Sequence, residues 1–515
     1  MRVLTFLLCI ALALPSAAWA QAARLPNLGD GAEITLGAER RIGDNIAREI
    51  FRDPDYVDDP VLGDYVQSIW RPLLLAARQR GELLPDMEQQ FAWKISLIRD
   101  RSINAFALPG GYLGVHLGLI ASVTSADELA SVLAHELTHV TQRHIARMME
   151  QQGRQGPVLI GAMILGMLAA SRAPVNSGSL NAANAVVVGG QAAAIQSQLN
   201  FSRDMEREAD RIGFGVMTEA GYEAQSFVTM FEKLQQAARL NDNGAYPYLR
   251  SHPMTTERIA DAQARQQLLP ARPPLALAPL HAMMSARATV LANPGVDALR
   301  NLSAQVEAVL SRPVPLARQA GTYYAAVLAD LRLREHAQAK RHLAQLQSLA
   351  GLDAASQRVV RWLAAEVALA VQEPTQAVAL LDNKVSLLSP QDRASRMLLA
   401  QSRVATQSAA QARLAAQEMS QWLNQNPRDA MAWGLLASAY QVQGDELRAI
   451  RAQGEARFVE LDYTAAADRF KAAQELALQL TREGKLDRAG HVEASIIDVR
   501  LRASEQLRRE QALQR

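Results

Sequence analysis

Three histidines lie close together in the stretch VLAHELTHVTQRH, residues 132–144: His135, His139 and His144. On a helix, residues four apart share one face with their Cβ atoms about 6 Å apart, so His135 and His139 can bind one zinc ion together. Glu136, one step round the helix, would then lie beside an open coordination position and could take a proton from zinc-bound water. The HExxH spacing therefore predicts a catalytic zinc site.

We expect His144 to stay outside this site. It follows His135 by nine positions, which is about half a revolution beyond two full turns of a helix, so on a continuing helix its side chain points away. A known pattern with a third ligand after HExxH needs glycine at position 142 and histidine at position 145, where this sequence has Gln142 and Ile145. We interpret His144 as a bystander.

A catalytic zinc site needs a third protein ligand, and a downstream helix can supply it as a carboxylate. The segment NFSRDMEREADRIGF, residues 200–214, places Glu206 and Asp210 four apart on one helical face. Glu206 could reach the metal, while Asp210 could accept a hydrogen bond from the distal nitrogen of a ligand histidine. The alternative is a solvated face on which neighbouring arginines pair with these acids. The HExxH motif upstream favours the metal site.

The elements around these residues predict a mixed domain. SADELASVLAHELTHV, residues 125–140, has apolar residues at helical intervals and a serine at its start that can cap a helix, so HExxH should lie on a helix. The runs FAWKISLI at 91–98 and GYLGVHLGLI at 111–120 read as strands. We expect residues 21–275 to form an α+β metalloprotease domain of the zincin type, mostly helical with a small sheet.

The remainder, residues 276–515, reads as an all-α repeat array. After the proline-rich segment at 268–280, nearly every stretch is rich in Ala, Leu and Gln with helical spacing. Tetratricopeptide-like spacing appears in Trp433, Leu436, Ala437, Tyr440, Gly444 and Ala449, and small residues recur 38, 38 and 34 positions apart at Ala339, Ala377, Ala415 and Ala449. This pattern resembles the tetratricopeptide family, whose stacks bind a segment of another protein on a concave surface. A plain helical bundle is the alternative.

Composition and the N-terminus bear on where the protein works. The chain has 515 residues and a formal net charge of +2, which argues against a nucleic-acid binder. Its start, MRVLTFLLCIALALPSAAWA, has one basic residue followed by an apolar run at 3–14. Ala18 and Ala20 stand at the two positions that signal peptidase recognises. We expect residues 1–20 to be an export signal cleaved after Ala20, an uncleaved anchor being the alternative. Cys9 is the only cysteine, so the mature chain would form no disulfides.

Four motifs follow one another in a familiar order: NAFALPGGYLGVHLGLI at 104–120, HELTH at 135–139, SRDMEREAD at 202–210 and RSHPMTTERI at 250–259. This order resembles the zinc peptidase family that includes the CAAX prenyl protease and the HtpX and Oma proteases, over residues 35–265. The resemblance implies one Zn²⁺ per subunit with ligands His135, His139 and Glu206, with Glu136 as general base and Asp210 as the catalytic partner that orients a ligand histidine. A zinc-activated water would attack the peptide bond.

Together with an export signal and a repeat array, the resemblance implies a periplasmic zinc endopeptidase in the quality control and assembly of outer-membrane β-barrel proteins. Its expected partners are misassembled outer-membrane proteins as substrates and the outer-membrane assembly machinery, bound through the array, with peripheral membrane association and no nucleic acid. The alternative function is a chaperone or assembly scaffold that acts through the array, with a secondary or latent protease activity.

Further predictions concern substrate binding and latency. Pro109 and the two glycines after it should form a turn, and Gly111, Tyr112, Leu113 and Gly114 an edge strand to which an extended substrate adds, a core hairpin being the alternative. His252 could be a fourth zinc ligand that keeps the enzyme latent, or a donor to the oxyanion, as against a structural histidine at a helix start. Arg258 is a weaker candidate for the oxyanion, and the apolar insert at 157–195 is either a lid or a buried hairpin.

Overall fold

The computed structural model describes residues 34–151, 203–239, 248–270, 277–292, 295–311, 313–385 and 392–512. The predicted export signal and the predicted lid at 157–195 lie outside the described residues. From Thr35 onward the described residues form one compact unit. The domain boundary between residues 275 and 276 stays a prediction.

Four strands form one mixed sheet in the order β1 (Tyr56–Val57), β2 (Lys94–Ile98), β4 (Tyr112–His116), β3 (Ala105–Leu108). β2 runs parallel to β4, whereas β1 pairs with β2 and β3 pairs with β4 in antiparallel fashion. A 3₁₀ turn at Pro109–Gly111 joins β3 to β4. Both of its glycines have a positive φ, 73° at Gly110 and 82° at Gly111, which residues with a side chain rarely adopt.

The prediction that Gly111, Tyr112, Leu113 and Gly114 form an edge strand is wrong. β4 pairs with a neighbour on both sides, and each of its residues is buried. The open edge on this side of the sheet belongs to β3, the strand before the turn. The glycine-rich turn was recognised correctly, but the sequence pattern does not say which of the two strands beside a turn continues into the sheet.

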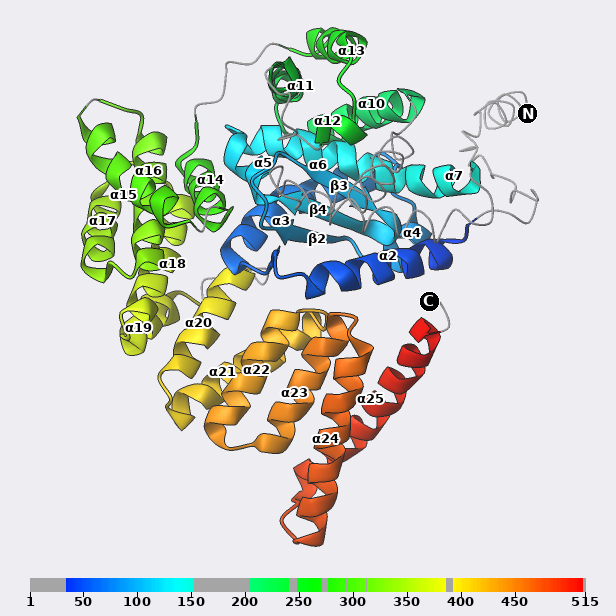
Figure 1. Ribbon diagram of the computed structural model, residues 1–515, viewed down its shortest axis with the longest axis vertical. Helices are drawn as coiled ribbons and strands as arrows, with labels where there is room; N and C mark the ends of the chain where they lie inside the picture. The colour runs from blue at the N-terminus through cyan, green and yellow to red at the C-terminus, as the bar shows by residue number, and fades with distance from the viewer. Residues whose placement is uncertain are drawn as a thin grey trace, which may run out of the picture. The chain divides into compact units, whose positions relative to one another are not determined.

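The helices of the N-terminal half include α6, which carries HExxH and contacts α3, α7, α10 and α11. They are α2 (Leu36–Arg52), α3 (Pro60–Gln79), α4 (Pro85–Gln90), α5 (Leu117–Ser122), α6 (Ala126–Thr141), α7 (His144–Gln151), α10 (Arg203–Glu219), α11 (Ala224–Arg239), α12 (Tyr248–Ser251) and α13 (Thr256–Gln267). The Ser125 hydroxyl caps α6 by accepting from the Glu128 N–H. α6 packs against β3 on one side and against α10 and α11 on another, so almost all of its side chains are buried (Figure 1).

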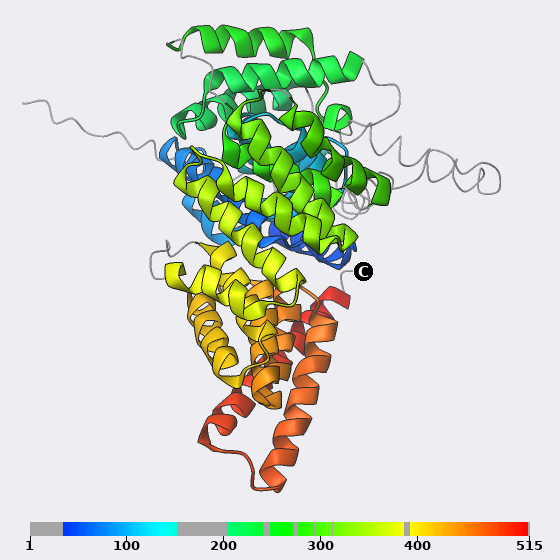
Figure 2. The ribbon, with the colours of Figure 1, turned by 90° about the vertical axis from the view of Figure 1, so that its left-hand side faces the viewer.

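Twelve further helices follow in the described part of the chain, and most pack mainly against their neighbours in sequence, whereas α14 packs against α16 and α5 (Figure 2). They are α14 (Pro279–Ala292), α15 (Val296–Leu310), α16 (Leu316–Leu333), α17 (His336–Ser348), α18 (Ala354–Ala370), α19 (Pro374–Val385), α20 (Arg393–Ala405), α21 (Ala409–Gln425), α22 (Ala430–Gln443), α23 (Glu446–Val459), α24 (Tyr463–Arg482) and α25 (Arg488–Ala512). The recurring alanines at 339, 377, 415 and 449 fall on alternate helices, α17, α19, α21 and α23, and are almost completely buried. They allow the two helices of a pair to approach closely.

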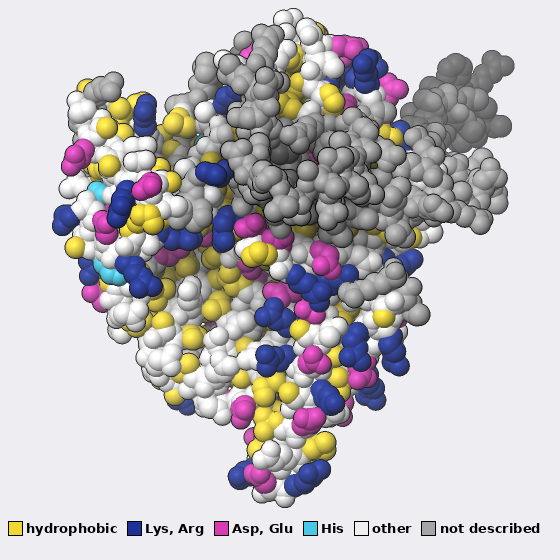
Figure 3. Space-filling view, in the orientation of Figure 1, with side chains coloured by type: hydrophobic (Ala, Val, Ile, Leu, Met, Phe, Trp, Pro, Cys, Tyr) yellow, Lys and Arg dark blue, Asp and Glu magenta, His cyan; other side chains and the backbone are white. Residues whose placement is uncertain are grey.

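The predicted fold class is confirmed: a mostly helical region with a small mixed sheet precedes a long run of helix pairs. Among the described residues, no helix combines the length and the apolar character needed to cross a membrane. On the face shown in Figure 3, Lys and Arg side chains are interspersed with Asp and Glu side chains over the C-terminal helices.

Candidate metal centre

Four buried side chains from three segments meet at one point: His135 and His139 from α6, Glu206 from α10, and His252 directly after α12. One potential ligand atom from each lies within 4.8 Å of the others. Every one of these residues is at most 2% exposed. Water therefore does not solvate these polar groups, which must be compensated by one another or by an ion.

The spacing of these atoms fits a tetrahedral zinc ion. Nε2 of His135 lies 3.0 Å from Nε2 of His139 and 3.3 Å from Nδ1 of His252. The Glu206 carboxylate oxygens lie 3.5, 3.4 and 2.9 Å from the His135, His139 and His252 nitrogens. Zinc–nitrogen bonds of 2.0–2.1 Å in a tetrahedron separate ligand atoms by about 3.3 Å. Imidazole and carboxylate are also the donor types that zinc takes in catalytic sites.

Asp210 lies behind the first histidine. Its Oδ1 is 3.0 Å from Nδ1 of His135, so this face of the ring meets a carboxylate while Nε2 faces the cluster. Arg258 binds both Asp210 oxygens, at 2.6 and 2.8 Å, and Oε2 of Glu206 at 2.8 Å. Burial disfavours the charged form of Asp210, but the hydrogen bonds from Arg258 outweigh it and hold the pKa of this carboxyl below its usual value. Arg258 therefore anchors two acids and is not directed at an oxyanion.

Glu136 is completely buried next to the cluster. Its Oε2 accepts a hydrogen bond from the backbone N–H of Ala107 in β3 at 2.9 Å. Its Oε1 accepts none from the described residues and lies 3.5 Å from Nε2 of His252. Burial raises the pKa of Glu136, against the opposing charges of His252 and His135. A carboxylate with a raised pKa and a free lone pair is suited to accept a proton.

The expectation that His144 points away from the site is wrong. α6 ends at Thr141, Arg143 adopts a left-handed φ of 53°, and α7 begins at His144. The chain thereby turns back, and Nδ1 of His144 lies 2.8 Å from Nδ1 of His139, while its Nε2 lies 3.1 Å from Oε2 of Glu208. Burial lowers the pKa of His144 to about 4, so its imidazole is neutral near pH 7.

Tyr248 is a neighbour of the cluster that sequence reasoning missed. It is buried, and its ring stacks on that of His252 with 4.6 Å between centroids and 27° between planes. The Tyr248 carbonyl accepts a hydrogen bond from the His252 N–H, because the two residues are one helical turn apart. An aromatic residue four positions before a histidine was the available signal.

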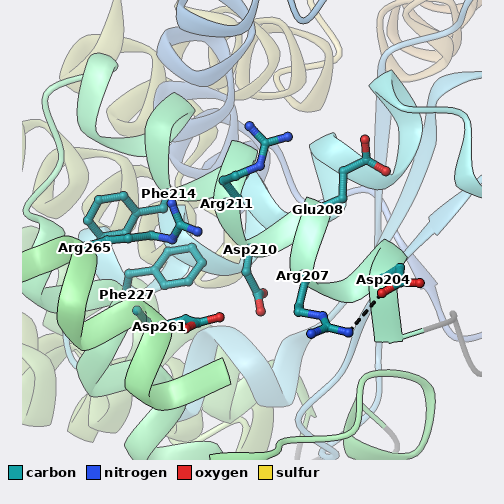
Figure 4. Close-up of a pocket in the computed structure, with 10 residues that line it drawn as sticks. Asp204, Arg207, Glu208, Asp210, Arg211, Phe214, Phe227, Asp261 and Arg265 are labelled. Carbon is teal, nitrogen blue, oxygen red and sulfur yellow. Dashed lines mark hydrogen bonds and ion pairs between the residues drawn. The ribbon is translucent and has the colours of Figure 1, made fainter. Parts of the chain in front are cut away.

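A pocket of about 320 Å³ opens along α10 and α13, beside the metal cluster (Figure 4). None of the four clustered residues lines it. Its walls are mainly charged, with an ion pair between Arg207 and Asp204, and they include Glu208 and Asp210. The pocket is therefore separate from the candidate metal site, although it is lined by Asp210, which contacts His135, and by Glu208, which contacts His144.

Comparison with known proteins agrees with this geometry. The model of Peptidase family M48 matches residues 77–266. A Vibrio cholerae protein that carries the name beta-barrel assembly-enhancing protease is 37% identical over 298 residues, or 57% of this chain and 58% of that protein. The Beta-barrel assembly-enhancing protease of Escherichia coli K12 is 33% identical over 243 residues, 47% of each chain. Mitochondrial metalloendopeptidase OMA1 of Schizosaccharomyces pombe is 27% identical over 231 residues, 44% of this chain and 60% of that one.

These matches cover about half of each relative. The region that the family model matches, residues 77–266, contains the metal cluster. The resemblance read from the four motifs is thereby confirmed. Residues 77–266 of this chain are thus similar in sequence to Peptidase family M48.

Proposed function

We propose that the chain is a periplasmic zinc endopeptidase that acts on outer-membrane β-barrel proteins. The observation that carries this proposal is the convergence of His135, His139 and Glu206 on one buried point, with the Glu136 carboxylate beside it. Two imidazoles and a carboxylate form the ligand set of many catalytic zinc sites, which leave a fourth position for water or substrate. The family of the matched region supports the same chemistry.

Each residue has a distinct part in the proposed reaction. Zinc held by these ligands would polarise the scissile carbonyl and lower the pKa of water. Glu136 takes the proton of the attacking water and later passes it to the leaving amine. The Ala107 N–H holds the Glu136 carboxylate in place through Oε2, so that Oε1 is left for the proton. Asp210 keeps the His135 ring in the tautomer that binds metal.

We place the substrate along β3, which replaces the predicted edge strand at 111–114. The His116 N–H donates to the Asn104 carbonyl, so the backbone groups of Asn104 face β4. Because the direction alternates along an antiparallel strand, the backbone groups of Ala105 and Ala107 face the open edge, and the Ala107 N–H does reach Glu136 there. An extended peptide added at this edge would pass beside the general base.

His252 is proposed as the fourth ligand of a resting site. Its Nδ1 lies within ligand spacing of both His135 and Glu206, and its ring is held by the stack with Tyr248. A site closed by four protein ligands has no room for substrate, so His252 would have to move before catalysis. Because the residue sits in a short link between α12 and α13, it can leave without moving α6 or α10.

We propose that the protease acts in the periplasm, in the assembly of outer-membrane β-barrel proteins. Two observations support this setting: the names of the bacterial relatives refer to β-barrel assembly, and the N-terminus resembles an export signal. In this setting the helix pairs recruit misassembled outer-membrane proteins or the outer-membrane assembly machinery, the protein associates peripherally with the membrane, and no nucleic acid takes part. The closed resting site favours one alternative, an assembly scaffold whose protease is latent.

The decisive variant is Glu136→Gln. We expect purified wild type to contain about one zinc per chain and to cleave casein or an unfolded β-barrel protein, and Glu136→Gln to keep the zinc and lose cleavage. Full complementation of a deletion strain by Glu136→Gln would favour the scaffold. A wild-type protein that remains metal-free in excess zinc would end the proposal.

A further inference from the structure

We propose that His144 is a positioning residue, which together with Glu208 orients the second zinc-ligand histidine, His139. The inference rests on the proposed function only in that the cluster binds zinc. The HExxH pattern assigns His144 no part in the site, and a continuing helix would carry it away. The observed break in the helix instead places its ring edge against that of His139, with 4.9 Å between ring centroids.

The nitrogen positions determine the direction of the hydrogen bonds. Nε2 of His144 faces the Glu208 carboxylate at 3.1 Å, and a carboxylate can only accept, so this nitrogen carries a proton. A His139 ring that binds zinc through Nε2 carries its proton on Nδ1, so Nδ1 of His144 is the acceptor. The two Nδ1 atoms lie 2.8 Å apart. Nε2 of His139 is left unprotonated, and it is this atom that lies in the cluster.

The turn before His144 has an unfavourable backbone conformation that a hydrogen bond to a distant helix stabilises. Arg143, just before His144, has a left-handed φ of 53°, a backbone conformation that is unfavourable for a residue with a side chain. The Arg143 guanidinium donates to Oε2 of Glu39, a carboxylate from α2 that is only 2% exposed. This charge-assisted hydrogen bond holds the turn between α6 and α7 in the form that directs His144 inward.

Both HExxH histidines are thus connected to a carboxylate of α10, one directly and the other through a second imidazole. His135 is bound by Asp210 directly, whereas His139 is bound by Glu208 through the imidazole of His144. Figure 4 shows the side chains of Glu208 and Asp210 pointing in different directions from the same helix, as two separate partners require. Because outer partners fix the tautomer and ring angle of a ligand histidine, losing one typically weakens metal binding by about 10- to 100-fold.

The two ends of the His144 ring can be tested separately. In His144→Asn the side-chain amide oxygen lies near the position of Nδ1, so it can still accept from His139 but no longer reaches Glu208. In His144→Gln the amide lies near the position of Nε2, so it can reach Glu208 but not His139. We would measure zinc dissociation constants by competition with a chromogenic chelator, and thermal unfolding of the metal-free proteins, for the full chain and both variants.

We expect His144→Gln to weaken zinc binding by about 10- to 100-fold, and His144→Asn to recover most of that loss. Glu208→Gln should give a smaller loss, and Asp204→Asn, an exposed acid on the same helix, none. Metal-free unfolding temperatures should not follow this order. Equal zinc affinity in wild type and His144→Gln, or equal losses in the Asn and Gln variants, would overturn the inference. A wild-type chain that binds no zinc would instead overturn the proposed function.

Discussion

The backbone N–H of Ala107 donates a hydrogen bond to Oε2 of Glu136 across 2.9 Å, which joins the edge strand β3 to the candidate general base. This hydrogen bond holds one oxygen of the buried carboxylate in place, and the backbone donor is rigid because β3 is paired to β4. The strand that we assign to substrate binding therefore also positions the proton acceptor.

Removing this donor should lower turnover without removing the metal. Ala107→Pro deletes the N–H at an edge position, where proline does not break the sheet ladder. We expect kcat to fall by roughly 10- to 100-fold, as for the loss of other groups that orient residues at metal sites, with about one zinc retained. Ala107→Ser keeps the N–H and is the matched control. Unchanged turnover in Ala107→Pro would show that the bond has no catalytic role.

Arg258 should be essential for the stability of the metal-free protein. It is 4% exposed and binds two carboxylates, those of Asp210 and Glu206. Arg258→Met removes the guanidinium from two buried acids and leaves them only histidine partners, a change that costs about 3–5 kcal/mol of unfolding free energy. Arg258→Lys keeps the charge but cannot bind Asp210 through two parallel bonds, so it should be only a partial rescue. Urea unfolding of the metal-free variants measures both values, and a Met variant as stable as wild type would contradict the expectation.

A second buried arginine joins the helix pairs to the N-terminal half. Arg287 of α14 binds Asp59 at the start of α3 and Glu366 of α18, at 2.7 and 2.6 Å, and is 4% exposed. We expect Arg287→Met to destabilise the chain by about 3–5 kcal/mol, because two carboxylates lose their counter-charge. The exposed pair Lys340–Glu373 is the comparison, since Lys340→Ala should cost less than about 1 kcal/mol. Similar urea midpoints for the two variants would contradict the expectation that Arg287→Met destabilises the chain more than Lys340→Ala.

Asp64 should make stability depend on pH. Burial raises its pKa to about 7 from a usual value near 3.8, although the Ala394 N–H that it accepts favours the charged form. Between these two pH values the folded state holds a proton that the unfolded state has lost, so this carboxyl makes stability fall as pH rises from about 4 to about 7, with no further change above that. Asp64→Asn keeps an acceptor for Ala394 without the charge.

The Asp64→Asn variant should therefore match wild type in melting temperature near pH 4 and exceed it at pH 8. Thermal unfolding across this range measures the difference, which should develop between about pH 4 and pH 7 and then level off. A difference that is constant with pH, or that shrinks as pH rises, would exclude Asp64 as its source.

Local periodicity explains which parts of the fold and site the sequence was able to predict. His135 and His139, like Glu206 and Asp210, are four residues apart, and this spacing alone places each pair on one side of its own helix. The alternation of helix pairs after α14 also follows from residue spacing within each repeat. Such features depend on neighbours in the chain, so composition and spacing suffice to recognise them.

Contacts between distant segments decided the rest. Which strand forms the sheet edge depends on the pairing of β2 with β4, and no local pattern reports it. Whether His144 faces the site depends on a break at Arg143 that is held by Glu39, about a hundred positions earlier in the chain. The sequence by itself determined the types and helical spacing of the metal-binding side chains, because an α-helix has a fixed repeat. Only the tertiary structure decided which further groups surround them, because burial and pairing bring together residues with no fixed separation along the chain.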